Sequence, residues 1–258
     1  INVEASGVTG GMGIGSTGLQ FFHGSTARFK IASDGSLSTP TAGTSNVRFG
    51  VNAGNSIASG GNYNVAVGDE AGTAITTGDQ NVAIGYGAAT ALTTGANTVA
   101  IGYLAGDALT TGENNIAIGK NALGAEDTHD FNIAIGSNAL AVQNAGADTH
   151  NVAIGHNAGT AVSTGIQNVI IGGLAGDSLT DADFNIVIGH TALGLDTLGS
   201  RSVAIGHSTL DAQNFTTATN TYNVAVGHAA GSAITTGVQN PLIGGLAGDV
   251  LSDADFNV

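Results

Sequence analysis

The sequence predicts an all-β fold, a parallel β-solenoid with about 17 residues in each coil, and three observations predict it. A pentad of the type Asn-Val-Ala-Ile-Gly returns along most of the chain. Nine of the twelve intervals between pentads have the same length, as from Asn64 to Asn81, and the other three are longer by one, two and four positions. The fifth position of the pentad is glycine in all twelve complete repeats. A repeat this short cannot hold a helix pair or a propeller blade, but it suits one solenoid coil with two short strands and two turns.

The repeat divides the chain into two parts. Residues 46–258 hold twelve complete coils and a truncated thirteenth, whereas residues 1–45 lack the pentad. Because Gly, Asp-Gly and Pro interrupt the N-terminal part, we expect short strands there, in a small β unit or a cap. A cap would cover the open edge of the first coil. Since the chain starts without a methionine and stops inside a repeat, we expect it to be part of a longer polypeptide.

Both faces of the repeated strand are apolar. In the pentad that begins at Asn64, Val65 and Val67 point to one face and Ala66 points to the other. Apolar and polar residues alternate along a strand that has one solvent-exposed face. This strand lacks that alternation and should be covered on both sides. We expect one face to line the coil interior and the alanine face to be covered by a neighbouring chain.

Two pentad positions have predicted structural roles. The glycine suits a corner that needs a positive φ or a close backbone approach. These turn glycines are Gly68, Gly85, Gly102, Gly119, Gly136, Gly155, Gly172, Gly189, Gly206, Gly227 and Gly244. The asparagines, stacked at one coil's rise, are predicted to form a structural ladder of amides that donate to one another. The ladder comprises Asn64, Asn81, Asn115, Asn132, Asn151, Asn168, Asn185, Asn223 and Asn240. At roughly 4.8 Å per strand, twelve coils would form a rod on the order of 58 Å long.

Composition and charge exclude several partners. Five basic residues stand against 19 acidic ones, for a net charge of -14, which disfavours nucleic acid and anionic membrane surfaces. No segment has the apolar length of a membrane span, so no membrane insertion is expected. There are no cysteines, and stability therefore does not come from disulfides.

A second level of repetition lies above the single coil. The segments 151–167 and 168–184 return, at one common displacement, as 223–239 and 240–256. Two of the longer coils contain extra residues, at 142–150 and 211–222, and extra residues in a solenoid must bulge outward. These loops are candidates either for receptor contact or for tolerated surface insertions.

The pentads, each followed by a small residue and a glycine-containing turn, resemble the head repeats of trimeric autotransporter adhesins over residues 46–258. That resemblance implies a left-handed parallel β-roll and a homotrimer packed about one axis. The coil of this chain is longer than the usual repeat of those adhesins. The segment RFKIASDGSLSTPTAGTSNVRFGVNAG resembles segments of bacteriophage tail fibres, which implies an extracellular virion protein that attaches to a host bacterial surface, through a glycan or protein receptor.

Three functions follow as hypotheses. The first is the structural shaft of a phage tail fibre, the second a trimeric adhesin on a bacterial surface, and the third a polysaccharide depolymerase on the same scaffold. We expect no enzyme activity and no cofactor, because no nucleophile-elbow or phosphate-binding motif occurs.

Three groups of side chains are candidates for chemical sites. Histidine follows the pentad at His156, His190, His207 and His228 and could bind a metal or an anion, although tyrosine, lysine, serine and glycine at that position favour a surface turn. The carboxylate pair Asp181 and Asp183 recurs as Asp253 and Asp255, which favours a repeat decoration over a catalytic pair. Glu126 and Asp127 lack a supporting motif. The sequence therefore predicts no catalytic, cofactor-binding or metal site.

Overall fold

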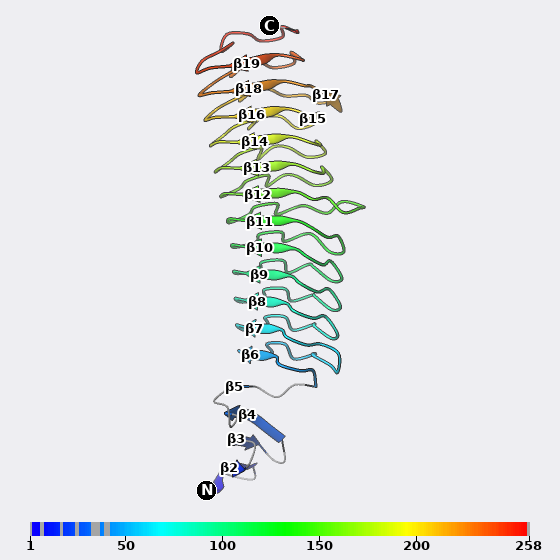
Figure 1. Ribbon diagram of the computed structural model, residues 1–258, viewed down its shortest axis with the longest axis vertical. Helices are drawn as coiled ribbons and strands as arrows, with labels where there is room; N and C mark the ends of the chain where they lie inside the picture. Colours follow the sequence, from blue (N-terminus) through cyan, green and yellow to red (C-terminus); the bar gives the residue numbers. More distant parts are fainter. Residues whose placement is uncertain are drawn as a thin grey trace.

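The computed structural model describes residues 2–5, 8–15, 18–23, 26–31, 37–38 and 42–256. These residues form no helix, and those from 42 onward wind into the predicted β-solenoid (Figure 1). Successive coils stack along one axis, with the N-terminal strands at one end of the stack and the C-terminus at the other. The all-β, parallel solenoid fold is thus confirmed.

One sheet of twelve parallel strands runs the length of the solenoid, in the order β19-β18-β16-β14-β13-β12-β11-β10-β9-β8-β7-β6. Each strand pairs residue for residue with the next coil, so that Ala117 of β10 lies between Ala100 and Ala134. The register follows from the repeat, because a one-residue slip would exchange the two faces. The strands are β6 (Val47–Phe49), β7 (Val65–Val67), β8 (Val82–Ile84), β9 (Val99–Ile101), β10 (Ile116–Ile118), β11 (Ile133–Ile135), β12 (Val152–Ile154), β13 (Val169–Ile171), β14 (Ile186–Ile188), β16 (Val203–Ile205), β18 (Val224–Val226) and β19 (Pro241–Ile243).

The alanine face of the sheet points into the coil, which corrects the expectation that another chain covers it. Ala66, Ala83 and Ala100 have no exposed surface, whereas the valines and isoleucines on either side of them are half-buried. The interior is narrow at this level: a Cβ on Gly106 would lie 3.6 Å from the Cβ of Ala117 and 3.7 Å from that of Ala100. A methyl group fills this space in most coils, so alanine lines the interior and the larger side chains face outward.

The other half of each coil consists mainly of turns, rather than the second strand predicted for it. Single hydrogen bonds still join the coils there, for example from the Thr76 N–H to the Thr93 carbonyl at 2.9 Å and from the Thr93 N–H to the Thr110 carbonyl at 2.8 Å. A second parallel pair forms only between β15 (Gly199–Ser200) and β17 (Thr219–Asn220) within the described residues. The turns bend this half too sharply for longer strands.

The turn glycines adopt the positive φ that the sequence predicts. Gly119 has a φ of 132°, and a Cβ on it would lie 2.5 Å from the carbonyl oxygen of Gly136 in the next coil. Non-hydrogen atoms cannot approach so closely without contact strain. The glycine column therefore lets the backbones of successive coils stack at the corner after each strand.

The described strands between residues 2 and 38 form a separate antiparallel sheet in the order β1-β2-β3-β4-β5. Its strands are β1 (Asn2–Ala5), β2 (Val8–Gly15), β3 (Gly18–His23), β4 (Thr26–Ile31) and β5 (Leu37–Ser38). Each strand pairs with the one before it in the chain, so the unit is a meander of hairpins. The meander lies beyond β6, at the N-terminal end of the solenoid (Figure 1).

Candidate functional surfaces and polar clusters

The asparagine column runs through the interior, and its amides bond chiefly to the backbone. The Nδ2 of Asn64 donates to the Gly78 carbonyl at 2.8 Å, and its Oδ1 accepts the Asn81 N–H at 2.9 Å. One amide thus fastens the start of a strand to the opposite turn of its own coil and to the next coil. At Asn132 the bond from the next coil's N–H to Oδ1 recurs, and at Asn240 the bond from Nδ2 to the opposite turn recurs. Both bonds recur at Asn81, Asn115, Asn151, Asn168, Asn185 and Asn223.

Most of the bonds between asparagine amides lie outside this column, for which they were predicted. Within the described part of the column, one such bond joins Asn168 to Asn151, at 3.3 Å. Bonds of this kind also link Asn121 to Asn138 at 3.3 Å and Asn138 to Asn157 at 3.0 Å, in the column two residues after the turn glycine. The interior asparagines bond to the backbone rather than to one another, because backbone carbonyl and N–H groups lie closer to each amide than the neighbouring amides do.

The outer face of the sheet carries a continuous apolar surface, here named the β-branched stripe. Its two columns contain only valine and isoleucine across ten successive strands. Ile154 is 36% exposed and Ile186 is 40% exposed. The stripe comprises Val65, Val67, Val82, Ile84, Val99, Ile101, Ile116, Ile118, Ile133, Ile135, Val152, Ile154, Val169, Ile171, Ile186, Ile188, Val203, Ile205, Val224 and Val226.

Aromatic rings stack in the column that follows the turn glycines, beside the stripe. The His190, His207 and His228 rings are parallel, with centroids 5.5 and 5.4 Å apart, and Tyr86 stacks on Tyr103 at 5.5 Å. The histidines are exposed, and His156 lies two coils before His190 with Gly173 between them. Parallel rings one coil apart do not converge on a common point, so the geometry gives the histidine column no metal-chelating arrangement.

The recurring aspartates connect coils. Asp183 accepts the Ile166 N–H at 2.9 Å, and Asp255 accepts the Val238 N–H at 2.8 Å, each across one coil step. Asp181 accepts the Thr164 hydroxyl at 2.6 Å. Asp253 accepts the neighbouring Ser252 hydroxyl at 3.2 Å. These contacts give Asp183 and Asp255 a structural role, as expected for a decoration of the repeat.

The two inserted segments bulge from the stack on the side away from the strands (Figure 1). The one at 142–150 lies between β11 and β12, and the one at 211–222 contains β17. Each segment places one glutamine side chain in the interior, where Gln143 and Gln213 are fully buried. The loops are therefore anchored in the core rather than simply attached to it.

Gln213 satisfies a buried acid. Its Nε2 donates to Oδ2 of Asp196 at 2.5 Å, and Oδ1 of Asp196 accepts the N–H groups of Gly199 and Phe215. The glutamine's Oε1 accepts a bond from Asn223 at 2.8 Å. Both oxygens of this fully buried carboxylate thus have donors.

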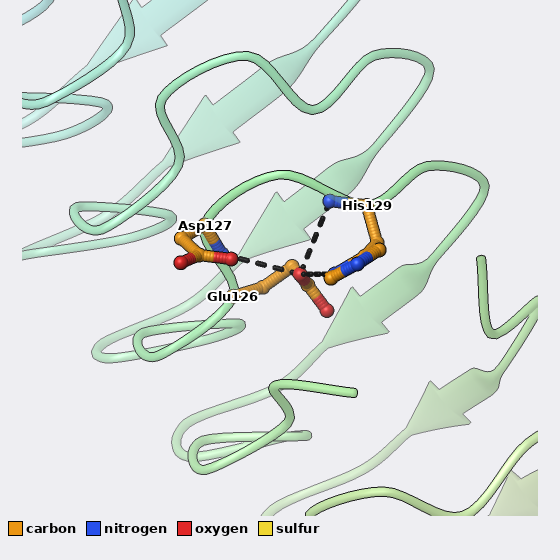
Figure 2. A group of neighbouring side chains, drawn as sticks. All are labelled: Glu126, Asp127 and His129. Carbon is orange, nitrogen blue, oxygen red and sulfur yellow. Dashed lines mark hydrogen bonds and ion pairs between the residues drawn. The ribbon is translucent and has the colours of Figure 1, made fainter. Parts of the chain in front are cut away.

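Glu126 occupies the corresponding place in an earlier coil, in a different environment (Figure 2). Its Oε1 accepts from the N–H groups of Asp127 and His129 and lies 2.9 Å from His129 Nδ1. Its Oε2 is buried and has no donor among the described residues. Burial raises the pKa of Glu126, and the hydrogen bonds with His129 offset part of that rise.

The ligand atoms of Glu126, Asp127 and His129 all lie within 4.8 Å of one another. Over the described part of the chain, no other three His, Cys, Asp or Glu side chains converge in this way. The sequence alone predicted no role for Glu126 and Asp127 and did not single out His129. A signal was nevertheless present, because the position of Glu126 is Ile75, Leu92 and Leu109 in the three preceding coils.

The comparisons with known proteins find no matching family model, no matching curated protein and no matching solved structure. Within the described residues, no helix long and apolar enough to cross a membrane is found.

Proposed function

We propose that this chain is a shaft segment of a homotrimeric phage tail fibre, a rigid extracellular rod that holds a receptor-binding part of the fibre at the host bacterial surface. The observation that carries the proposal is the β-branched stripe. A rod of stacked coils supplies stiffness through its continuous sheet and its interior asparagine column. The stripe supplies the surface on which copies of the rod pack together.

The size of the stripe favours a protein partner. Ten strands at about 4.8 Å, each three residues long, form a face on the order of 500 Å². Contiguous apolar patches of more than a few hundred Å² on a soluble protein generally mark interaction sites. A stripe this long and narrow matches another rod of the same length better than it matches a compact partner.

The charge distribution favours a second copy over an unrelated chain. The protein carries a net charge of -14, so two copies repel wherever their acidic surfaces meet. The stripe contains no charged residue from Val65 to Val226. It is therefore the surface on which copies of this chain approach one another with the least repulsion. Three copies about one axis would bury all three stripes together.

The native mass tests the assembly. We expect light scattering on the purified chain to give three times 25.1 kDa. Ile101→Glu places a charge in the stripe and should yield monomers. Thr111→Glu, at an exposed position of the same coil, should leave the trimer intact. A wild-type monomer would contradict the shaft proposal.

The location on a virus particle needs its own test. Antibodies raised against this chain should label fibres at the tail of phage particles in electron micrographs of lysed host cultures. Labelling confined to the surface of bacteria would instead place the chain in a bacterial adhesin.

A further inference from the structure

The cluster around Glu126 replaces an apolar core position with a carboxylate. Ile75, Leu92 and Leu109, at the same position of other coils, are fully buried. Glu126 also has no exposed surface. Burying a carboxylate is costly unless a counter-charge or a full set of donors compensates it. The structure must therefore supply such compensation, and the question is what provides it.

Asp196 shows how the same position is satisfied without a ligand. Three protein donors serve its two oxygens, and Gln213 in the next coil provides the third of them. The corresponding glutamine near Glu126 is Gln143, and it points elsewhere. Its Nε2 donates to the Ser163 carbonyl at 3.2 Å, and its Oε1 accepts from Asn151 at 2.7 Å. The side-chain N–H that in Gln213 bonds to Asp196 is therefore, in Gln143, bonded to a backbone carbonyl, and it is not available to Glu126.

Two further differences distinguish this coil. The residues one and three positions after the buried acid are Asp127 and His129, whereas after Asp196 they are Thr197 and Gly199. The buried acid that receives no hydrogen bond from the glutamine of the next coil is thus the acid with two further metal-binding side chains in its own coil. Figure 2 shows the Glu126 carboxylate between the side chains of Asp127 and His129.

We propose that Glu126, Asp127 and His129 bind one divalent transition-metal ion, for which Zn²⁺ is the best match. Two carboxylates and one imidazole are a donor set that Zn²⁺ accepts, with water at its fourth position. The imidazole disfavours Mg²⁺ and Ca²⁺, which prefer oxygen ligands. The bound ion supplies a positive charge beside the buried carboxylate, which His129 supplies only when its ring is protonated.

The geometry requires only small movements. Ligand atoms about 2.1 Å from a tetrahedral ion lie roughly 3.4 Å apart, and the three ligand atoms here already lie within 4.8 Å of one another. Asp127 is partly exposed and the His129 side chain is 18% exposed, so both can rotate and an ion can enter from solvent. His129 binds in the tautomer that carries its hydrogen on Nε2, with the lone pair of Nδ1 directed at the ion.

Calorimetric titration of the chelator-treated chain with ZnCl₂ tests the proposal. We expect one Zn²⁺ per chain and at least tenfold weaker binding in Asp127→Ala and His129→Ala. Glu126→Gln should weaken binding at least tenfold and still fold. Glutamine occupies this position in coils that, like this one, hold leucine three residues earlier, as Gln143 and Gln213. Circular dichroism checks the fold of each variant. His207→Ala, in the exposed histidine column, is the matched control and should bind Zn²⁺ as the wild type does.

Three outcomes would overturn the site. No stoichiometric Zn²⁺ binding by the wild type would mean that a proton, on Glu126 or on its partner His129, compensates the carboxylate instead. Loss of binding in His207→Ala would place the ion on the histidine column. Equal affinity for Zn²⁺ and Ca²⁺ would show that the imidazole is not a ligand.

Discussion

The Leu109 side chain occupies the space that a side chain on Gly106 would need. A Cβ on Gly106 would lie 2.8 Å from the Cδ1 of Leu109. The same relationship joins Gly72 to Ile75 and Gly176 to Leu179, at 2.7 and 2.8 Å. Two other coils hold leucine at the position of Gly106, as Leu123 and Leu193. At the position of Leu109, these coils hold an acid, Glu126 or Asp196. These two positions of a coil together therefore hold one large aliphatic side chain, at one position or the other.

Exchanging the two positions tests this relationship. Leu109→Gln should lower the free energy of unfolding by about 3 kcal/mol, because it removes apolar contacts and buries an amide. Gly106→Leu alone should also destabilise, by overpacking. The double variant should lose less than the sum of the single variants, since leucine at the glycine position fills the space. Urea unfolding of all four proteins measures the coupling. Additive losses would show that the two positions are independent.

The turn glycines differ in what a methyl group would meet. Gly119→Ala places a Cβ 2.5 Å from a backbone oxygen that cannot move freely. Gly244 has a similar φ, 130°, but its Cβ would meet nothing closer than the Ala247 methyl at 4.0 Å. Both substitutions incur strain of roughly 1–3 kcal/mol from the positive φ, and only Gly119→Ala adds a clash. We therefore expect Gly119→Ala to lower the thermal midpoint much further than Gly244→Ala. Similar losses would mean that φ alone requires glycine.

The sequence predicted the solenoid, its period and the glycine corner because those features repeat in every coil. The prediction that the alanine face lies outside, against another chain, was wrong. Ala66, Val65 and Val67 are all apolar, and only the width of the coil, set by residues on the opposite side, decides between them.

The sequence also did not reveal that the presence of Leu109 requires a residue as small as Gly106. Nor did it reveal that a coil with leucine at the position of Gly106, such as Leu123, holds a buried acid three residues later. These depend on contacts across a coil that a linear comparison of repeats does not display.

The interior asparagines should contribute strongly to stability. In Asn168→Ala, the Asn185 N–H and the Ala182 carbonyl lose the partners that now lie at 2.9 and 2.7 Å. Each buried group left unsatisfied costs roughly 1–3 kcal/mol, so a total loss of about 2–6 kcal/mol is expected. Asn168→Thr should lose less, because Thr98 occupies the same column and its hydroxyl lies 3.5 Å from the Gly112 carbonyl. Chemical denaturation of both variants gives the comparison, and equal losses would indicate that the amide acts only by its volume.

Asp177 should make stability depend on pH. Burial raises the pKa of Asp177 above its ordinary value of 3.8, and the negative charge of Asp211 raises it further. The folded protein therefore binds this proton more tightly than the unfolded chain does, and stability is lost as the pH rises through the folded-state pKa. Asp177→Asn should match the wild type below about pH 3 and become the more stable protein as the pH rises towards about 7. Thermal midpoints measured across that range provide the test, and a constant difference between the two proteins would show that the effect does not arise from ionisation of Asp177.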